Sequence, residues 1–181
     1  MTRKEIAATL ATMRIIVDTR EQDTERSRRR YEAFGVPIVR KALSFGDYAY
    51  TAVLPSGCPI NGTVKDGAIT PTCVIERKMN LDELALCFGK ERARFEREFE
   101  RAKSAGARVF LLVENASWEL LLAGRYRSRL NSNAYTASLT AWMIRYNIGV
   151  IFCKEESSGR IIRELLYRDL RERLEQGEFD E

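Results

Sequence analysis

The sequence has no histidine, no long apolar run and no closely spaced pair of cysteines. The absence of histidine excludes histidine zinc ligands, histidine general bases and Ser-His-Asp triads. No apolar stretch approaches the roughly 18 residues that span a bilayer, and the segment from Met1 to Glu5 lacks the apolar core of a secretory signal. We therefore expect no membrane contact and a cytoplasmic protein encoded by a bacterium, archaeon or phage, or a nuclear protein in a eukaryote.

The four cysteines are widely separated along the chain: Cys58, Cys73, Cys87 and Cys153. A bridge between the first two across a hairpin is one interpretation, but reduced thiols are the expected state in a cytosolic protein. No internal repeat or low-complexity linker divides the 181 residues. This length favours a single domain with a substantial core.

Charge is abundant, and its distribution says more than its total. The net charge of +4 permits nucleic-acid binding without requiring it. One basic cluster, Arg26 to Arg30, has few acids beside it, and phosphate contact is the favoured interpretation. The cluster from Lys90 to Lys103 contains glutamates, so a solvated helix face with i,i+4 pairs explains it equally well.

Apolar periodicity predicts strands alternating with helices. Strands are expected over residues 14–17, 36–42, 47–53, 73–78, 109–113 and 150–153. Helices are expected over residues 3–13, 21–34, 81–88, 95–105, 118–122, 133–146 and 157–174, and residues 55–71 read as a turn-rich loop. An initial antiparallel hairpin followed by such alternation predicts an α/β fold with a mixed central sheet and helices on both faces.

Three charged clusters stand at predicted strand ends: Asp18-Thr19-Arg20-Glu21, Gly46-Asp47-Tyr48 and Glu76-Arg77-Lys78. Residues two apart in a strand share a face, so Glu76 and Lys78 point the same way. Mg²⁺ in phosphodiester hydrolysis is held by one or two carboxylates. Asp47 and Glu76 can supply these carboxylates, and Lys78 can orient the attacking water. We predict that the three clusters form one metal-dependent nuclease site.

The motifs Asp18-x-Arg20-Glu21, Gly46-Asp47-Tyr48 and Glu76-Arg77-Lys78-x-x-x-Asp82 occur in this order. Together they resemble the nuclease domain of the XPF-type structure-specific endonuclease family, over roughly residues 14–170. The resemblance implies a restriction-endonuclease-like, three-layer α/β/α fold for residues 14–176, preceded by an appendage over residues 1–13. We expect no tandem helix-hairpin-helix domain, a module that many family members carry.

The resemblance also implies roles for individual residues. Asp18, Asp47 and Glu76 would hold Mg²⁺, for which Mn²⁺ can substitute, and Lys78 would serve the nucleophilic water. Glu21 would brace the site, and Asp82 would orient Lys78 or Arg77. The residues expected to contact DNA are Arg20, Arg28, Arg29, Arg30, Arg77, Arg125 and Arg127.

Each role has a plainer alternative. Asp18 and Glu21 suit a helix N-terminus, Asp47 suits an ordinary turn, and Asp82 suits any first helical turn. Glu76 and Lys78 would also form an ordinary surface ion pair. The loop around Tyr126 offers an aromatic ring for an unpaired base, or carries that tyrosine incidentally.

The expected function is a metal-dependent endonuclease that cuts branched DNA, at flaps, forks or Holliday-type junctions, in recombination, replication or repair. The resemblance implies a homodimer formed through the nuclease domain, with Trp142, Tyr146 and Ile162 at the interface or in the core. A protein partner supplying duplex binding is a further expectation. The alternatives are a restriction-type or nicking duplex nuclease and a non-catalytic DNA-binding subunit.

Overall fold

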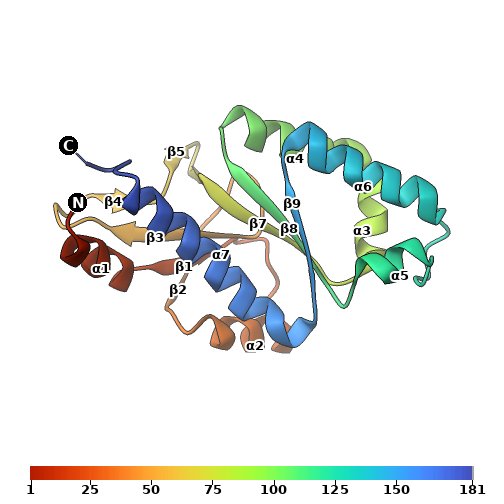
Figure 1. Cartoon of the computed structure of the whole chain (residues 1–181), viewed down its shortest axis with the longest axis horizontal. Helices are drawn as coiled ribbons and strands as arrows, with labels where there is room; N and C mark the ends of the chain where they lie inside the picture. Colours follow the sequence, from red (N-terminus) through yellow and green to blue (C-terminus); the bar gives the residue numbers. More distant parts are fainter. Residues whose placement is uncertain (181) are drawn as a thin grey trace. The chain divides into compact units, whose positions relative to one another are not determined.

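The computed structural model describes residues 1–180, which form two compact units (Figure 1). Unit 1 consists of Met1–Val74 together with the chain from Gly159 onward, and unit 2 consists of Ile75–Ser158. The chain therefore leaves unit 1 once and later returns to it. Both units combine strands with helices.

Unit 1 is built on a mixed β-sheet. Its strands are β1 (Arg14–Val17), β2 (Ile38–Arg40), β3 (Tyr48–Val53), β4 (Pro59–Ile60), β5 (Thr63–Lys65), β6 (Ala68–Thr70) and the start of β7 (Cys73–Lys78). β1 runs parallel to β2 and antiparallel to β3, with Ile15 opposite Ile38 on one side and Tyr50 on the other. β4 pairs antiparallel with β3. These pairings confirm the predicted mixed sheet.

The β-branched run of β1 forms the centre of this unit. Ile15, Ile16 and Val17 are fully buried, as expected for a strand that is covered on both faces. Helix α2 (Glu25–Phe34) begins four residues later than predicted, because the side chain of Thr24 accepts the N–H of Ser27 and caps the helix there.

The turn-rich segment 55–71 was predicted as a loop, and this prediction is wrong in detail. It contains β4 and the antiparallel hairpin of β5 and β6. Two apolar residues within the segment, Ile60 and Ile69, are buried. The burial of these two side chains stabilises the short strands, which the many turn residues of the segment made hard to predict from the sequence.

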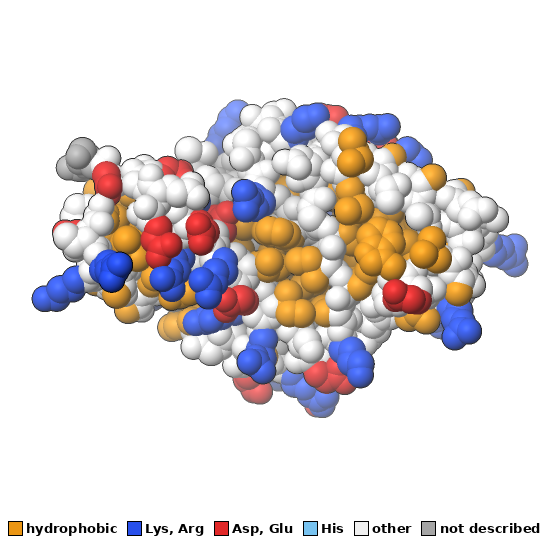
Figure 2. Space-filling model, viewed as in Figure 1, with side chains coloured by type: hydrophobic (Ala, Val, Ile, Leu, Met, Phe, Trp, Pro, Cys, Tyr) orange, Lys and Arg blue, Asp and Glu red, His pale blue; other side chains and the backbone are white. Residues whose placement is uncertain are grey.

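Helix α7 (Glu155–Glu175) covers unit 1 from Gly159 onward. Its buried face carries Ile162, Leu166, Leu170 and Leu174 at a spacing of four. The outer face mixes acidic and basic side chains (Figure 2), including i,i+4 pairs such as Arg168 with Glu164. Packing, and not these exposed pairs, therefore holds the helix in place.

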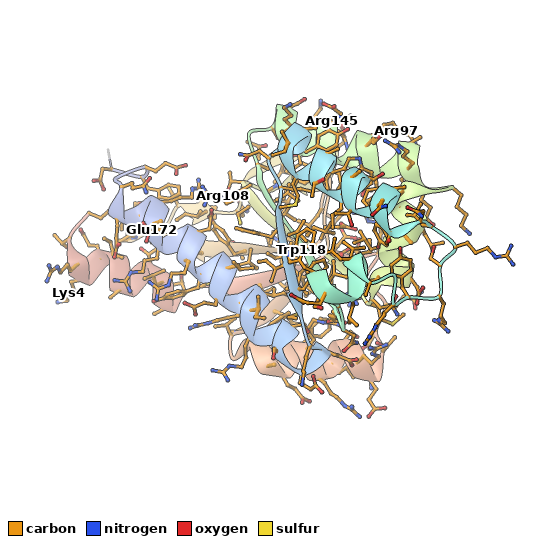
Figure 3. The ribbon with its side chains drawn as sticks, turned by 45° about the vertical axis from the view of Figure 1, so that its right-hand side comes forward. Lys4, Arg97, Arg108, Trp118, Arg145 and Glu172 are labelled. Carbon is orange, nitrogen blue, oxygen red and sulfur yellow. The ribbon has the colours of Figure 1, made fainter. Side chains whose placement is uncertain are left out.

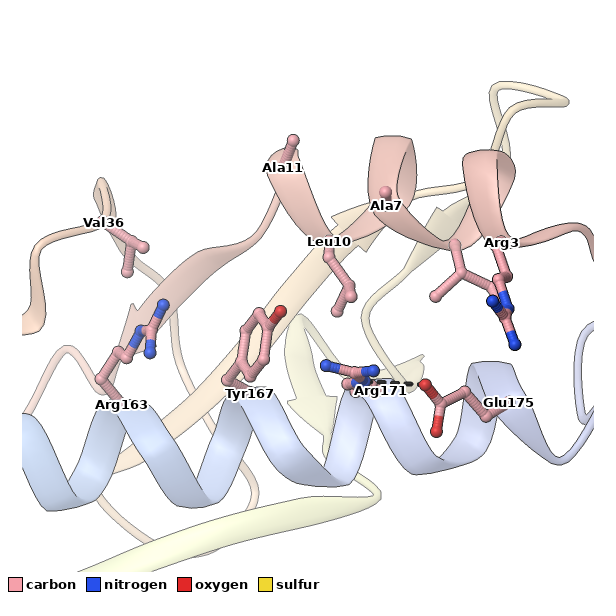
Figure 4. Close-up of a pocket in the computed structure, with 10 residues that line it drawn as sticks. Arg3, Ala7, Leu10, Ala11, Val36, Arg163, Tyr167, Arg171 and Glu175 are labelled. Atoms are coloured by element: carbon pink, nitrogen blue, oxygen red, sulfur yellow. Dashed lines mark hydrogen bonds and ion pairs between the residues drawn. The ribbon is translucent and has the colours of Figure 1, made fainter.

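Helix α1 (Arg3–Ala11) belongs to unit 1 and starts with a capping box between Thr2 and Glu5. A hollow of about 920 Å³ lies between α1 and α7. Figure 4 shows Leu10 on one side of the hollow and Tyr167 on the other. Most of the segment predicted as an appendage, residues 1–13, thus forms a helix of unit 1, and this helix lines the hollow together with α7.

Unit 2 contains the end of β7 and an aromatic core. Its remaining elements are α3 (Leu81–Phe88), α4 (Arg92–Ser104), β8 (Arg108–Glu114), α5 (Trp118–Leu122), α6 (Ser132–Tyr146) and β9 (Gly149–Cys153). β8 and β9 are parallel. The ring of Trp142 lies 4.2 Å from Phe88 and 5.2 Å from Phe99, centroid to centroid. Figure 3 shows side chains filling this region between the helices.

The structure decides between core and interface for three residues. Trp142, Tyr146 and Ile162 are 1%, 6% and 0% exposed, so they are core residues, and the interface interpretation of them is wrong. No helix within residues 1–180 has the length and apolar character needed to cross a membrane.

Candidate active site

Asp18 follows β1 directly and is 1% exposed. Its Oδ1 accepts the backbone N–H of Arg20 at 2.8 Å and the Nε of the same arginine at 2.7 Å. Its Oδ2 accepts the backbone N–H of Leu43 at 2.7 Å. Three donors therefore converge on one buried carboxylate, which fixes both the turn after β1 and the distant loop around Leu43.

The same loop is held from its other side by the β5–β6 hairpin. Ile69 accepts the N–H of Ser44 at 2.9 Å and donates its own N–H to Ala42 at 2.8 Å. Leu43 is 4% exposed. The loop that leads to Gly46 and Asp47 is thus held by hydrogen bonds to Asp18 on one side and to β6 on the other.

Gly46 occupies a position that no other residue fits. Its φ is +74°, and a Cβ placed there would lie 2.2 Å from Cγ2 of Val74. The following residue, Asp47, is half-buried, and its carbonyl oxygen accepts the N–H of Asp18 at 2.9 Å. The two predicted ligands of unit 1 are therefore neighbours across a backbone hydrogen bond.

Glu21, Tyr48 and Arg30 form a second cluster in unit 1. The Tyr48 hydroxyl donates to Oε1 of Glu21 at 2.6 Å and accepts from Nη1 of Arg30 at 3.1 Å. Arg30 is 4% exposed and lies 3.5 Å from Glu21. The bracing role of Glu21 stays a prediction. The geometry does not fit the prediction that Arg30 contacts DNA, because the guanidinium of Arg30 is buried against these partners.

Arg28 and Arg29 of α2 are solvent-exposed, whereas Arg26 is half-buried. Arg28 pairs with Asp23 and Arg29 pairs with Glu25. The hydrogen bond from Arg28 lowers the pKa of Asp23 below its usual value. DNA contact by Arg28 and Arg29 stays a prediction, since exposed pairs of this kind also occur on ordinary surfaces.

In unit 2, Glu76 and Lys78 lie on the same side of the end of β7, as the strand period predicted. Lys78 Nζ donates to Oε1 of Glu76 at 2.5 Å, and both residues are only 7% exposed. The ammonium also lies 4.5 Å from the centroid of the Phe95 ring. Burial at this level makes the pair unlike an ordinary surface ion pair.

Arg77 points to the opposite side of β7 from its neighbours and pairs with Glu114. Its Nη1 lies 3.3 Å from Oε2 of Glu114, which is fully buried. Sequence reasoning missed Glu114. The available signal was an acid at the end of the apolar run in β8, a position that needs a cationic partner when it is buried.

Asp82, in the first turn of α3, contacts a loop that is distant in the sequence. Its Oδ1 accepts the N–H of Arg127 at 2.7 Å and of Ser128 at 2.8 Å. Burial opposes ionisation, but these hydrogen bonds outweigh it and lower the pKa of Asp82. The structure therefore connects Asp82 to the arginine loop, whereas the sequence predicted that it orients Lys78 or Arg77.

The carboxylates differ in how well they suit a divalent cation such as Mg²⁺, which prefers oxygen ligands. Glu76 uses only Oε1 in its hydrogen bond to Lys78, and within residues 1–180 its Oε2 has no hydrogen-bond donor. Asp18 already accepts three N–H groups. Glu76 thus fits as a direct ligand better than Asp18 does. Among the described residues, no group of three or more Asp, Glu or Cys side chains gathers as a metal site.

The structure thus brings Asp18, Arg20 and Asp47 together in unit 1, and Glu76 with Lys78 in unit 2. A single site formed by all three sequence clusters stays a prediction. The roles of Asp18, Asp47 and Glu76 as metal ligands also stay predictions.

Comparison with known proteins gives the family. The ERCC4 domain model matches residues 17–165. No curated protein sequence matches the chain. Among solved structures, XPF from Aeropyrum pernix is similar, with 23% identity and a TM-score of 0.58, over 86% of this chain and 61% of that one. The same protein in complex with DNA gives 22% identity and a TM-score of 0.59, over 89% and 66%.

At these identities the two structures establish the fold alone, and they confirm the predicted restriction-endonuclease-like α/β class. The chain spans less than two thirds of the length of either. The ERCC4 match, in contrast, covers most of the present sequence. This chain therefore belongs to the ERCC4 domain family, the XPF-type nuclease domains that its three motifs resemble.

Proposed function

We propose that this domain is a metal-dependent endonuclease that hydrolyses DNA phosphodiesters at branched structures. The observation that carries the proposal is the buried pair of Glu76 and Lys78, which share one side of the end of β7. A carboxylate with a spare oxygen beside an ammonium suits a reaction that needs a cation ligand and a positive group near the scissile phosphate.

The proposed ligands are Asp47 and Glu76, with Asp18 as a brace or ligand. A bound Mg²⁺ or Mn²⁺ would polarise the phosphoryl oxygen and lower the pKa of a bound water. Lys78, held by Glu76 and the Phe95 ring, would orient the attacking water and stabilise charge on the phosphate. Arg20, whose side chain is 54% exposed although it pairs with Asp18, is a proposed contact for a DNA phosphate.

Branched DNA is the proposed substrate because the family resemblance implies it. A DNA complex is known for the similar XPF structure, which supports DNA as the ligand class. A restriction-type duplex nuclease would use the same chemistry, and only its cutting of linear duplex would distinguish it from the proposed enzyme. A non-catalytic subunit is the weaker alternative, since Asp47, Glu76 and Lys78 are all present.

We further propose a homodimer, with a protein partner that supplies additional duplex binding. All five residues of β9 are half-buried, and Figure 2 shows hydrophobic side chains on the surface near this strand. An apolar surface of this kind supports self-association. Light scattering on the purified chain tests the dimer, and a monomer at micromolar concentration would contradict it.

The decisive experiment is cleavage of end-labelled DNA with Mg²⁺, Mn²⁺ or EDTA. The panel contains linear duplex, single strand, 3′ flap, fork and four-way junction. Glu76→Gln and Asp47→Asn are expected to abolish cleavage. Asp66→Asn is the matched control, because Asp66 is an exposed carboxylate at the β5–β6 turn. Equal cutting of linear duplex would favour the restriction-type alternative, and binding without cutting in either metal would favour the non-catalytic one.

A further inference from the structure

The segment between α5 and α6 presents three arginines in a fixed arrangement. Arg125, Arg127 and Arg129 are exposed, whereas the residues between them, Tyr126 and Ser128, are half-buried. Exposed arginines thus alternate with half-buried side chains along a segment whose backbone is bent at residues 126–128. We call residues 125–129 the arginine loop.

Two connections hold the arginine loop to the start of α3. The first is Asp82, whose Oδ1 accepts two successive N–H groups of the loop, from Arg127 and Ser128. Its Oδ2 lies 3.3 Å from Nε of Arg127, a weaker contact because that side chain is 89% exposed. The main interaction of Asp82 is thus with the backbone of the loop.

The second connection runs through two tyrosines. Tyr126 donates its hydroxyl to the carbonyl of Leu130 at 2.8 Å, and its ring packs edge-on against Tyr135 at 5.3 Å. Tyr135 is fully buried and donates to the carbonyl of Leu81, the residue before Asp82. Tyr126 therefore supports the loop, and this use of its ring argues against stacking on a base.

We propose that Asp82 is a positioning residue that fixes the arginine loop as a binding site for the phosphates of a DNA strand. The inference rests on the proposed function and assigns to this carboxylate a role in binding. Arginine recognises phosphate through a planar fork of donors, and a prearranged loop loses less conformational entropy when it binds.

A comparison of two substitutions isolates the positioning role from the charge. Both Asp82→Ala and Asp82→Asn remove one negative charge, which by itself strengthens DNA binding. Only Asp82→Asn keeps an Oδ1 that can accept the two N–H groups. We therefore expect Asp82→Ala to weaken binding by roughly tenfold, since the loop loses its main anchor, and Asp82→Asn to bind as tightly as the wild type or more tightly.

The experiment measures the affinity of a fluorescent 3′-flap duplex in EDTA across a salt series. Arg127→Gln should reduce the slope of log K against log[salt] by about 0.9, the value for one lost phosphate contact. Arg97→Gln is the matched control, an exposed arginine on the glutamate-rich helix α4 (Figure 3). Amide exchange at Arg127 and Ser128 should accelerate in Asp82→Ala and stay slow in Asp82→Asn.

Cleavage at saturating DNA separates binding from catalysis. We expect KM to rise in Asp82→Ala while kcat stays within about twofold. A fall in kcat with unchanged affinity would overturn the inference and place Asp82 with Lys78 or Arg77. Equal weakening by Asp82→Asn and Asp82→Ala, or an Arg97→Gln effect as large as that of Arg127→Gln, would also overturn it. A wild-type chain that binds no DNA would instead contradict the proposed function itself.

Discussion

The ammonium of Lys78 lies 4.5 Å from the centre of the Phe95 ring, so a core aromatic residue of α4 helps to fix the proposed catalytic cation. Phe99, one turn later in the same helix, is equally buried but packs against Trp142 and Tyr146. The two phenylalanines thus provide a matched pair: one contacts the cation and the other does not.

We predict that Phe95→Leu lowers kcat roughly 2- to 30-fold, the range that corresponds to the loss of about 0.5–2 kcal/mol of cation–π interaction. Both Phe95→Leu and Phe99→Leu should reduce the free energy of unfolding by about 1–3 kcal/mol. Only Phe95→Leu should affect kcat after correction for the folded fraction. Equal losses of activity in the two variants would show that packing alone is responsible.

Replacing Asp18 with asparagine should destabilise the protein by about 1–3 kcal/mol, because an amide group cannot accept hydrogen bonds at both positions from Arg20 and Leu43. Denaturant unfolding measures the change. Asp23→Asn is the control, since that carboxylate is exposed and pairs with the exposed side chain of Arg28; its effect should stay within about 0.5 kcal/mol. A stability of Asp18→Asn equal to that of the wild type would contradict the bracing role.

Glu114→Gln should cost about 1.5–3 kcal/mol, since the substitution removes the charge of a fully buried partner of Arg77. Because Arg77 is also expected to contact DNA, DNA affinity should fall in parallel. Thermal unfolding and flap binding test the two effects. The exposed carboxylate of Glu100 on α4 provides the control, and Glu100→Gln should change neither quantity.

The thiols should differ in reactivity. Cys58 is exposed and Cys87 is buried, and burial raises the pKa of the Cys87 thiol to about 12. The protonated, covered thiol of Cys87 should therefore react with a disulfide reagent only on unfolding. Titration of the native chain should show a fast phase that Cys58→Ser removes. A fast phase that persists in Cys58→Ser would contradict this assignment.

The stability contributed by ionised Asp82 should depend on pH in a defined direction. Its pKa is lower in the folded chain than in the unfolded chain, so the contribution is complete above the unfolded value of about 3.9 and is lost as the pH falls through the folded value. The difference in unfolding free energy between wild type and Asp82→Asn should be constant near neutral pH and shrink in strong acid. A difference that grows in acid would contradict the lowered pKa.

Local patterns in the sequence predicted the parts of the site that depend on neighbouring residues. The two-residue period of a strand was sufficient to place Glu76 and Lys78 on one side of β7. Asp18 and Gly46 were identified at the ends of their strands, because a buried apolar run that stops at a charge or a glycine is visible without a structure.

Contacts between distant segments were not predictable in this way. Asp82 appeared to serve its own motif, yet its partners Arg127 and Ser128 are 45 and 46 residues away. Arg30 was grouped with solvent-exposed arginines, although its spacing from the buried residues Ser27 and Phe34 on α2 places it on the inner face. The many charged side chains of α2 obscured this spacing of its buried residues.

The return of the chain to unit 1 at Gly159 has a consequence for synthesis. A Cβ at Gly159 would lie 2.6 Å from the carbonyl oxygen of Arg30, so this residue allows α7 to approach α2 closely. The helix then supplies Asp169 and Arg173 to the Tyr50 hydroxyl. During translation, residues 75–158 emerge as one continuous stretch, whereas residues 1–74 complete their unit only with the segment from Gly159 onward. Unit 1 therefore completes its tertiary structure only after all of unit 2 has been translated.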